Sequence, residues 1–295
     1  MILNFSELEN LARERGRKTI VVPSPETLPI IEGLKKSEEF IKPILVGDAA
    51  KIEELLEKVP LENAEIIKAE TPEEALTLGL HLVRTGSAEL LMKGRMITPD
   101  FLKDILHKER GLRTERILSH IAVHGISTYP KMLWLTDAGV NPHPDWEKKV
   151  GILKNAVDAL HRIGYSKPKV ALLASVETVH PELPETMEAA AFAKMAERGG
   201  FGEVIMDGPL AFDIAISKEA AELKGIKSEV AGDADLLVVP DVITGNVLSK
   251  ALIYLAGAKV GGVILGALVP IVLLSRADTP ERKYYSIVLA VSLTE

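Results

Sequence analysis

Two short polar segments follow apolar runs late in the chain and contain residues that could bind a phosphate. The run DLLVVP at 235–240 is typical of a buried strand, and a polar turn at 241–246 precedes a helical pattern that starts at Val247. This turn contains Thr244, Gly245 and Asn246. At such a helix start the free backbone N–H groups and the helix dipole both favour an anion. The pattern therefore predicts an anion site at this turn.

The second polar segment ends another pair of apolar runs, GGVILGAL and PIVLL. It supplies a hydroxyl, a fixed cation and a carboxylate close together, as Ser275, Arg276 and Asp278. Each segment also has a plainer interpretation, as an N-terminal helix cap and as a surface loop, because capping polar residues are common at every helix start. The pattern alone leaves both interpretations open.

A third group of candidates follows the run ELLMKG at 89–94. Lys93 and Arg95 stand where that strand should end, and ligands of open parallel sheets bind beyond the carboxyl ends of strands. Two cations there suit an anionic ligand, although a solvated basic turn explains Arg95 equally well. Thr98, followed by a proline, is predicted to cap the next helix.

Further along, Arg113 and Ser119 lie in or beside an extended segment. His120 and His124 are four residues apart, a spacing that suits a metal only on a helix. Because ILSHIAV looks extended, ordinary packed or hydrogen-bonded histidines are the favoured interpretation.

The elements that must position these residues alternate strictly in the first part of the chain. Strands are expected at 19–23, 43–47, 64–69 and 89–94, with helices between them. Such alternation indicates parallel strands joined by helical crossovers, an α/β fold. Further strands are expected at 131–137, 169–175 and 203–210, and a terminal helix at 280–293, which should dock through Tyr284, Ile287, Val288 and Val291.

The composition limits the classes of function. The chain has 295 residues, of which 47% are hydrophobic and 26% charged, enough to bury a core. A net charge of −7 argues against a nucleic-acid partner. No apolar run is long enough to span a membrane, and the start reads as a charged amphipathic helix, so we expect a cytoplasmic protein. Cysteine is absent, which excludes thiolate chemistry by the protein itself.

Several common catalytic motifs are missing from the sequence. We find no G-x-G-x-x-G dinucleotide fingerprint, no G-x-x-x-x-G-K-[ST] P-loop and no H-E-x-x-H. No serine lies in G-x-S-x-G either. The usual nicotinamide, ATP-driven and hydrolase chemistries are therefore disfavoured.

The longer motifs resemble a known family, the phosphate acetyl/butyryltransferases. The matching segments are LMKGRMITPDFLKDILHKERGLRT, LSHIAV, LWLTDAGVN, PIVLLSRAD and the long segment that runs from DGPLAFD to TGN. They extend from about Ile44 to the C-terminus. The forms DGPLAFD and SRAD favour the butyryl branch over the acetyl branch.

This resemblance implies the reaction acyl-CoA + phosphate ⇌ acyl phosphate + CoA, with no metal, no bound cofactor and coenzyme A as a substrate. It implies two α/β domains similar to those of the isocitrate/isopropylmalate dehydrogenases, with the active site in the interdomain cleft. The first domain should comprise residues 1–126 and 272–295, and the second residues 127–271. A homo-oligomer, a dimer or a multiple of one, is implied as well.

The resemblance also implies roles for individual residues. Ser275 and Arg276 match a serine-arginine pair of the family. We assign Ser275 to the oxyanion or the leaving phosphate, and Arg276 to the negative charge of the phosphate. Arg113 should hold the phosphate group. The residues implied to bind substrate with less defined roles are Lys93, Thr98, Ser119, Thr244, Gly245 and Asn246.

One position departs from the pattern of the acetyl branch. That branch has an aspartate seven residues after the serine, thought to deprotonate the thiol, and this chain has Arg282 there. We therefore expect Asp278 to act as the base. A surface carboxylate without a catalytic role is the alternative.

Three other functions remain open from the sequence. They are a phosphate acetyltransferase, a non-catalytic module that senses CoA or phosphate, and a metal-dependent β-decarboxylating dehydrogenase of the same fold. The last needs a set of acidic metal ligands and a nucleotide site, and the sequence offers neither in recognisable form.

Overall fold

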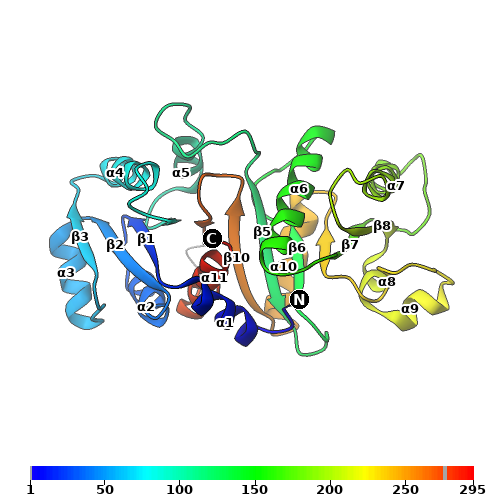
Figure 1. The fold of residues 1–295 in the computed structure, drawn as a ribbon, viewed down its shortest axis with the longest axis horizontal. Helices are drawn as coiled ribbons and strands as arrows, with labels where there is room; N and C mark the ends of the chain where they lie inside the picture. Colours follow the sequence, from blue (N-terminus) through cyan, green and yellow to red (C-terminus); the bar gives the residue numbers. More distant parts are fainter. Residues whose placement is uncertain (1, 275–277) are drawn as a thin grey trace. The chain divides into compact units, whose positions relative to one another are not determined.

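The computed structural model describes residues 2–274 and 278–295, and these form two compact units (Figure 1). The terminal unit comprises Ser6–Leu118 and Val260–Glu295, and the central unit comprises Met1–Phe5 and Ser119–Lys259. The resemblance placed the divisions near residues 126 and 272 instead. The strand at 119–125 pairs with the strand at 133–136, and the strand at 259–265 pairs with the one at 271–272. The domain division that the resemblance implies stays a prediction.

The terminal unit is built on a mostly parallel sheet with the strand order β3-β2-β1-β4-β11-β10. Its strands are β1 (Lys18–Pro23), β2 (Ile41–Gly47), β3 (Glu65–Lys68), β4 (Leu90–Met92), β10 (Lys259–Leu265) and β11 (Ile271–Val272). The pairs among β1 to β4 are parallel, as the alternating pattern predicts, and β11 joins β4 in parallel. Strands β10 and β11 pair in antiparallel fashion.

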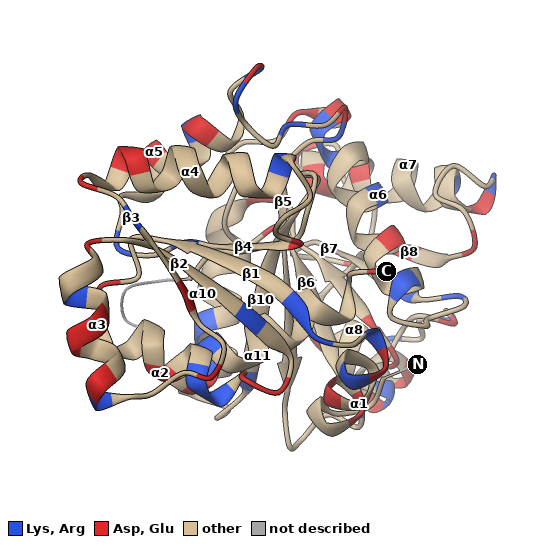
Figure 2. Ribbon diagram, turned by 60° about the vertical axis from the view of Figure 1, so that its left-hand side comes forward, with Lys and Arg blue, Asp and Glu red and all other residues tan. Residues whose placement is uncertain are grey.

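Helices accompany these strands, and several of them begin directly after a side chain that caps the helix. They are α1 (Phe5–Arg15), α2 (Leu28–Lys36), α3 (Ala49–Lys58), α4 (Pro72–Arg84), α5 (Thr98–Ile105) and α11 (Pro280–Ser292). Asp48 caps α3 by accepting from the Lys51 N–H at 3.3 Å, and Thr71 caps α4 just before its initial proline. Several charged residues lie on the surface of α3 (Figure 2).

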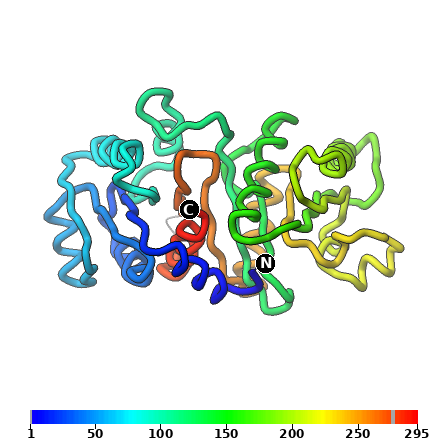
Figure 3. Tube along the Cα trace, viewed as in Figure 1, coloured from blue at the N-terminus to red at the C-terminus, as the bar shows by residue number. Residues whose placement is uncertain are grey.

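Helices α1 and α11, from opposite ends of the chain, lie side by side (Figure 3). Ile287, Val288 and Val291 of α11 are fully buried, which confirms the predicted docking of this helix. The Ser292 hydroxyl donates to the Leu8 carbonyl at 3.2 Å, and the Tyr284 hydroxyl donates to Glu9 at 2.9 Å. Helix α11 is therefore part of the core of this unit.

The strands of the central unit have the order β5-β6-β9-β7-β8. The strands are β5 (Ser119–Gly125), β6 (Leu133–Thr136), β7 (Lys169–Leu173), β8 (Ile205–Leu210) and β9 (Leu236–Val238). Its helices are α6 (Trp146–Arg162), α7 (Pro184–Glu197), α8 (Phe212–Ile216), α9 (Lys218–Leu223) and α10 (Val242–Tyr254). Strand β9 pairs in parallel with β6 and β7, β7 pairs in parallel with β8, and β5 pairs with β6 in antiparallel fashion. None of the helices in the described ranges is both long and apolar enough to cross a membrane.

A buried ion network holds the start of β7 beside the segment that leads into β9. The Lys131 ammonium lies 2.6 Å from the Asp235 carboxylate and 2.9 Å from that of Asp233, and Lys169 reaches Asp233 at 2.7 Å. Burial alone would raise the pKa of Asp233, but hydrogen bonds from Lys169 and Lys131 outweigh it and hold the pKa below its usual value. Both Lys131 and Asp235 are almost inaccessible, so neither charge has water as a substitute partner.

Removal of the Lys131 cation should strongly destabilise the folded protein. We expect Lys131→Met to lower the free energy of unfolding by about 3–5 kcal/mol, because it leaves the buried Asp235 carboxylate without its counter-charge. Urea denaturation followed by circular dichroism measures the change. The double variant Lys131→Met/Asp235→Asn removes both charges and should regain much of the loss. A Lys131→Met protein as stable as wild type would show that the network contributes nothing.

Candidate active site

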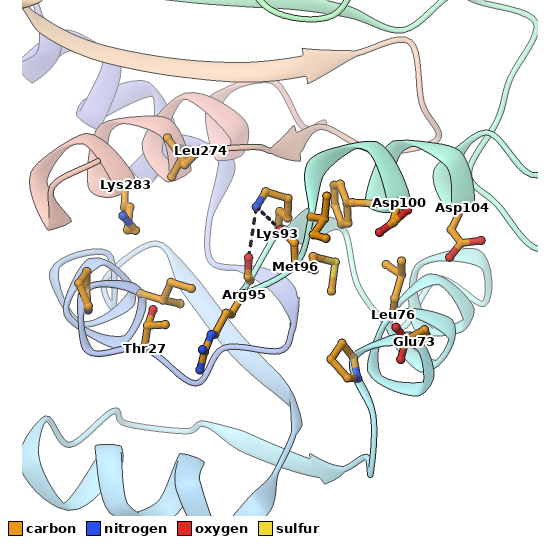
Figure 4. A pocket seen from close by; sticks show the side chains of 16 residues that line it. Thr27, Glu73, Leu76, Lys93, Arg95, Met96, Asp100, Asp104, Leu274 and Lys283 are labelled. Carbon is orange, nitrogen blue, oxygen red and sulfur yellow. Dashed lines mark hydrogen bonds between the residues drawn. The ribbon is translucent and has the colours of Figure 1, made fainter. Parts of the chain in front are cut away.

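A pocket of about 730 Å³ opens in the terminal unit where β4 ends and several helices begin (Figure 4). It is lined by the N-cap of α2 (Thr27), the first residues of α4 (Pro72 and Glu73) and two residues at the start of α5 (Ile97 and Asp100). Helix N-termini carry unpaired N–H groups and a positive partial charge, and carboxyl ends of parallel strands are the usual ligand sites of α/β sheets. The location therefore suits an anionic ligand.

Basic and acidic side chains occupy opposite sides of this pocket. Lys93, Arg95 and Lys283 lie on one side in Figure 4, and Glu73, Asp100 and Asp104 lie on the other. Leu274, the last described residue before the segment 275–277, lines the basic side. An anion would thus bind on the side that leads directly to this segment.

Lys93 lies where the sequence places it, directly after β4. Its side chain is buried, and its ammonium donates to the carbonyls of Gly94 at 3.3 Å and Met96 at 3.1 Å. Its backbone N–H donates to the Val272 carbonyl of β11 at 2.9 Å. These bonds hold the ammonium at the pocket wall beside the strand that leads to Leu274.

The next residue, Gly94, is where the loops after β1 and β4 touch. A Cβ atom built on Gly94 would lie 2.1 Å from the carbonyl oxygens of both Pro23 and Ser24. The Arg95 N–H also donates to the Ser24 carbonyl at 2.6 Å. Only glycine allows this approach of two backbones, so Gly94 determines the path of the loop that carries Lys93 and Arg95.

Lys283 is a pocket residue that our sequence analysis missed. It is buried in the first turn of α11, and its ammonium donates to the Asp278 carbonyl. Gly33 of α2 makes room for it, since a Cβ there would lie 2.7 Å from the Lys283 Cβ. Its position four residues before Ile287, within the apolar stripe of the helix, is the signal that could have identified it.

The environment of Lys283 affects its titration. Burial lowers the pKa of the Lys283 amine below its ordinary value, the negative charge of Asp278 opposes that shift and the neighbouring Arg282 adds to it. A cation held at this pocket wall would be stabilised by an incoming anion.

Of the three residues expected to be catalytic, Ser275 and Arg276 lie outside the described residues. Asp278 is described, and its carboxylate lies 3.2 Å from the Arg282 guanidinium. Arg282, which stands where the acetyl branch has an aspartate, is therefore the ion-pair partner of the carboxylate that we expect to act as the base.

The other two candidates in the terminal unit do not line the pocket. Thr98 is the first residue of α5, and the N-cap is Ile97, so the predicted Thr98 cap is wrong by one residue. Arg113 is exposed and forms an isolated antiparallel bridge with Ala267. Substrate binding by Thr98 and Arg113 stays a prediction.

Ser119 belongs to the central unit and is fully buried at the start of β5. Its hydroxyl accepts a hydrogen bond from the Asn155 side chain at 2.9 Å. This bond connects β5 to α6 and satisfies a polar group that has no access to water. The structure thus gives Ser119 a packing role within its unit, and a ligand role stays a prediction.

The helix start near Thr244 differs from the sequence prediction. Helix α10 begins at Val242 rather than Val247, so Thr244, Gly245 and Asn246 lie in its first turn. The N-cap is Asp241, whose carboxylate accepts from the Thr244 N–H at 2.8 Å. Thr244 therefore does not present the free N–H group that we expected for a phosphate.

Gly245 and Asn246 instead contact the loop after β6. A Cβ on Gly245 would lie 2.9 Å from the Ala138 Cα, and the Asn246 amide donates to the Ala138 carbonyl at 3.5 Å. This close packing orients the first turn of α10 against that loop. Any ligand role of the turn depends on its exposed Thr244 and Asn246 side chains.

His120 and His124 lie in strand β5, which agrees with the extended conformation predicted for them. The His124 Nδ1–H donates to the Leu133 carbonyl at 3.3 Å, so its Nε2 accepts from the Ser249 hydroxyl of α10 at 2.9 Å. His124 is thus a hydrogen-bonded core histidine. In the described part of the chain, no group of three or more His, Asp or Glu side chains is placed to hold a metal ion.

His124 should make the stability of the protein depend on pH. Burial lowers its pKa to about 4, although the bond to Leu133 opposes the shift, whereas an unfolded histidine titrates near roughly 6.5. The unfolded chain binds more protons between these values, so stability should fall by up to about 3 kcal/mol as the pH drops from 6.5 to 4. Unfolding free energies measured across this range for wild type and His124→Asn test this. Equal slopes for both proteins would contradict it.

Comparison with known proteins places these features in a family. The family model described as "Phosphate acetyl/butaryl transferase" matches residues 62–291. A probable phosphate butyryltransferase of Bacillus subtilis (strain 168) is 42% identical over 295 residues, covering 99% of each chain. A phosphate acetyltransferase of Rickettsia felis is 43% identical over 290 residues, which cover 96% of this chain and 83% of the relative.

Solved structures show the same fold. A branched-chain phosphotransacylase from Enterococcus faecalis V583 has a TM-score of 0.84 at 31% identity, over 94% of this chain and 98% of that one. A putative 4-hydroxythreonine-4-phosphate dehydrogenase from Salmonella typhimurium has a TM-score of 0.58 at 15% identity, over 94% and 100%. The latter supports the expected likeness to a dehydrogenase-type α/β fold. The chain belongs to the phosphate acetyl/butyryltransferase family.

Proposed function

We propose that this protein transfers a short acyl group between coenzyme A and inorganic phosphate, in the reaction butyryl-CoA + phosphate ⇌ butyryl phosphate + CoA. Family membership supports the reaction, and the DGPLAFD and SRAD segments support a butyryl-like chain. The structural observation that carries the proposal is the pocket whose basic side combines the buried Lys93 and Lys283 with nearby helix N-termini.

The charges of the substrates explain why such a pocket is needed. Coenzyme A and phosphate are both polyanions, and fixed cations and helix N-termini bind phosphate groups. Lys93 and Lys283 provide ammonium groups held by protein carbonyls, so they need little reorganisation to accept an anion. Arg113, Thr98, Ser119, Thr244, Gly245 and Asn246 are proposed as further substrate-binding residues.

Thioester formation from acyl phosphate illustrates the chemistry. Asp278, oriented by Arg282, takes the thiol proton of CoA, and the sulfur attacks the acyl carbonyl carbon. The carbonyl oxygen becomes an oxyanion, which the Ser275 hydroxyl stabilises. The bond from the carbonyl carbon to the phosphate oxygen then breaks, and phosphate leaves with its charge compensated by Arg276. No covalent enzyme intermediate is required, because CoA supplies the sulfur and the chain has no cysteine.

The same proposal includes the setting of the reaction. The enzyme uses coenzyme A as a substrate and holds no cofactor or metal of its own. It works in the cytoplasm as a homo-oligomer, without nucleic acid or a membrane as a partner.

A specific observation keeps the acetyl reaction as a second candidate. The acetyltransferase of Rickettsia felis is 43% identical to this chain and the probable butyryltransferase of Bacillus subtilis is 42% identical. Such similar values do not separate the two chain lengths. A pocket discriminates between chains that differ by one methylene by only about 1–3 kcal/mol. A small number of substitutions would therefore be enough to change the preferred chain length.

The experiment that tests the function is a CoA-release assay with a thiol reagent. Acetyl-, butyryl- and isobutyryl-CoA are compared, each with and without phosphate. Phosphate-dependent release that is fastest with a four-carbon chain supports the butyryl reaction, and fastest release with acetyl-CoA supports the second candidate. No release from any of them would contradict both, and CoA binding without turnover would then indicate a sensing module.

A further inference from the structure

Lys283 brings an amine to the wall of the pocket described above. Lysine is almost never fully buried, yet this residue is only 4% exposed while it lines the pocket. Its side chain comes from α11, and Figure 4 shows its nitrogen directed away from that helix. The pocket is therefore the route by which a small molecule reaches this amine.

The amine also lies beside the segment that we expect to perform the reaction. Leu274, the residue before Ser275, lines the same side of the pocket. Asp278, the first described residue after 275–277, accepts a hydrogen bond from the Lys283 ammonium through its backbone carbonyl. One flanking residue thus shares the pocket wall with the amine, and the other is bonded to it.

The surroundings of Lys283 favour the neutral, nucleophilic form of its amine. Burial lowers the pKa of this amine below its ordinary value, the charge of Asp278 opposes that shift, and Arg282 adds to it. Only an unprotonated amine has the lone pair that attacks a carbonyl carbon. An ordinary lysine, with a pKa near roughly 10.4, is unprotonated in about 1 of 2,500 molecules at about pH 7, and each unit of decrease raises that fraction about tenfold.

Lys93, the other buried ammonium of the pocket, is less suited to attack a carbonyl carbon. It donates to the carbonyls of Gly94 at 3.3 Å and Met96 at 3.1 Å. Among the described residues, the Lys283 ammonium donates to the Asp278 carbonyl alone. Fewer hydrogen bonds must therefore break before the Lys283 nitrogen can react.

The proposed reaction supplies a reagent for such an amine, because an acyl phosphate is an activated acyl donor. We propose that Lys283 is a self-acylation site, at which the acyl phosphate bound in the pocket transfers its acyl group to the side-chain amine. The inference rests on the proposed function, which provides the acyl phosphate and places it at this pocket.

The transfer balances without any further reactant. The neutral Lys283 nitrogen attacks the acyl carbonyl carbon of butyryl phosphate, and a C–N bond forms. The bond from that carbon to the bridging phosphate oxygen breaks, and the phosphate leaves with the electron pair. The nitrogen gives up one proton to the departing phosphate, so the products are an amide and hydrogen phosphate.

Such a modification would change the pocket. Acylation of a lysine removes its positive charge, so the basic side of the pocket would lose one of its cations. A hydrogen bond to a charged group contributes enough that its loss should raise the KM for phosphate roughly 10-fold or more. Accumulated acyl phosphate would therefore slow the enzyme that makes it.

Peptide mass spectrometry after incubation with synthetic butyryl phosphate tests the site. We expect butyrylation of Lys283 that saturates with reagent concentration and is suppressed by inorganic phosphate, because the reagent reacts from its bound state. Its initial rate should exceed that of the exposed Lys42 and Lys154 by roughly 10-fold or more, since binding holds the reacting atoms together. The N-hydroxysuccinimide ester of butyric acid, which has no phosphate, should modify the exposed lysines faster instead.

A pair of matched variants tests the consequence for activity. Lys283→Arg keeps a cation, but a guanidinium does not give up its proton and so cannot be acylated in this way. Incubation with butyryl phosphate, followed by dilution into the CoA-release assay, should inactivate wild type and spare Lys283→Arg. The control Lys42→Arg changes an exposed lysine of β2 and should be inactivated like wild type. If Lys283→Arg has no activity from the start, the labelling rates of wild type decide.

The outcomes separate this inference from the proposed function. Normal phosphate-dependent CoA release with an unmodified Lys283, or with labelling no faster than that of Lys42, would overturn the self-acylation and leave the function intact. Labelling that phosphate does not suppress would overturn it as well. No CoA release from any acyl-CoA would contradict the proposed function, whereas saturable labelling of Lys283 would still support the site.

Discussion

A Ser275→Ala enzyme is expected to lose about 10²–10³-fold in kcat for phosphate-dependent CoA release from butyryl-CoA. Under the proposed mechanism, the Ser275 hydroxyl donates to an oxygen that becomes fully negative only in the transition state. The KM values for both substrates should therefore change little, because a bond made mainly in the transition state affects kcat rather than ground-state binding.

The control for this experiment is Ser6→Ala, which removes an exposed hydroxyl on α1. It should keep wild-type kinetics. If Ser275→Ala also kept near-wild-type kcat, the hydroxyl would have no role in stabilising the oxyanion. A raised KM for phosphate with unchanged kcat would move Ser275 from the reacting oxygen to ground-state phosphate binding.

A Gly94→Ala substitution is expected to damage both stability and activity. The new Cβ would lie 2.1 Å from two backbone carbonyl oxygens, of Pro23 and Ser24, and neither can rotate away as a side chain could. The loop after β4 must shift, which should cost about 1–3 kcal/mol of stability. The shift displaces the Lys93 ammonium, and a misplacement of about 1 Å can cost roughly 10²-fold in rate.

Thermal or urea unfolding and steady-state kinetics measure the two effects of Gly94→Ala. The matched control for stability is Gly139→Ala, because a Cβ there would lie no closer than 3.6 Å to its nearest neighbour, an ordinary contact. We expect that variant to unfold within about 0.5 kcal/mol of wild type. A Gly94→Ala protein with wild-type stability and kcat/KM would show that the two loops can separate without consequence.

The contrast between α3 and α10 shows which helix starts could be predicted. Asp48 is the one strong capping residue before a clear apolar repeat, and α3 begins directly after it. Before α10, both Asp241 and the group Thr244–Asn246 are capable of capping, and local preference does not separate them. Asp241 becomes the cap because Gly245 packs closely against Ala138, which requires the first turn to be already helical there.

Lys283 illustrates a site residue that sequence reasoning overlooks. Lysine is normally a surface residue, and its burial here depends on the absence of a side chain at Gly33, a residue 250 positions earlier in the chain. No local pattern reports such a contact. Lys93 was found because its signal is local, as a cation directly after an apolar strand in an alternating α/β pattern.

The sequence by itself determined the α/β class, the parallel direction of the early strands and the family. These follow from hydrophobic periodicity and from long motifs, which are properties of neighbouring residues. Only the tertiary structure decided that Lys283 reaches the pocket, that Gly94 lets two backbones approach closely and that one face of α10 remains uncovered. Each of these depends on how distant segments pack, and packing is set by the shapes of all the neighbours together rather than by the local residue pattern.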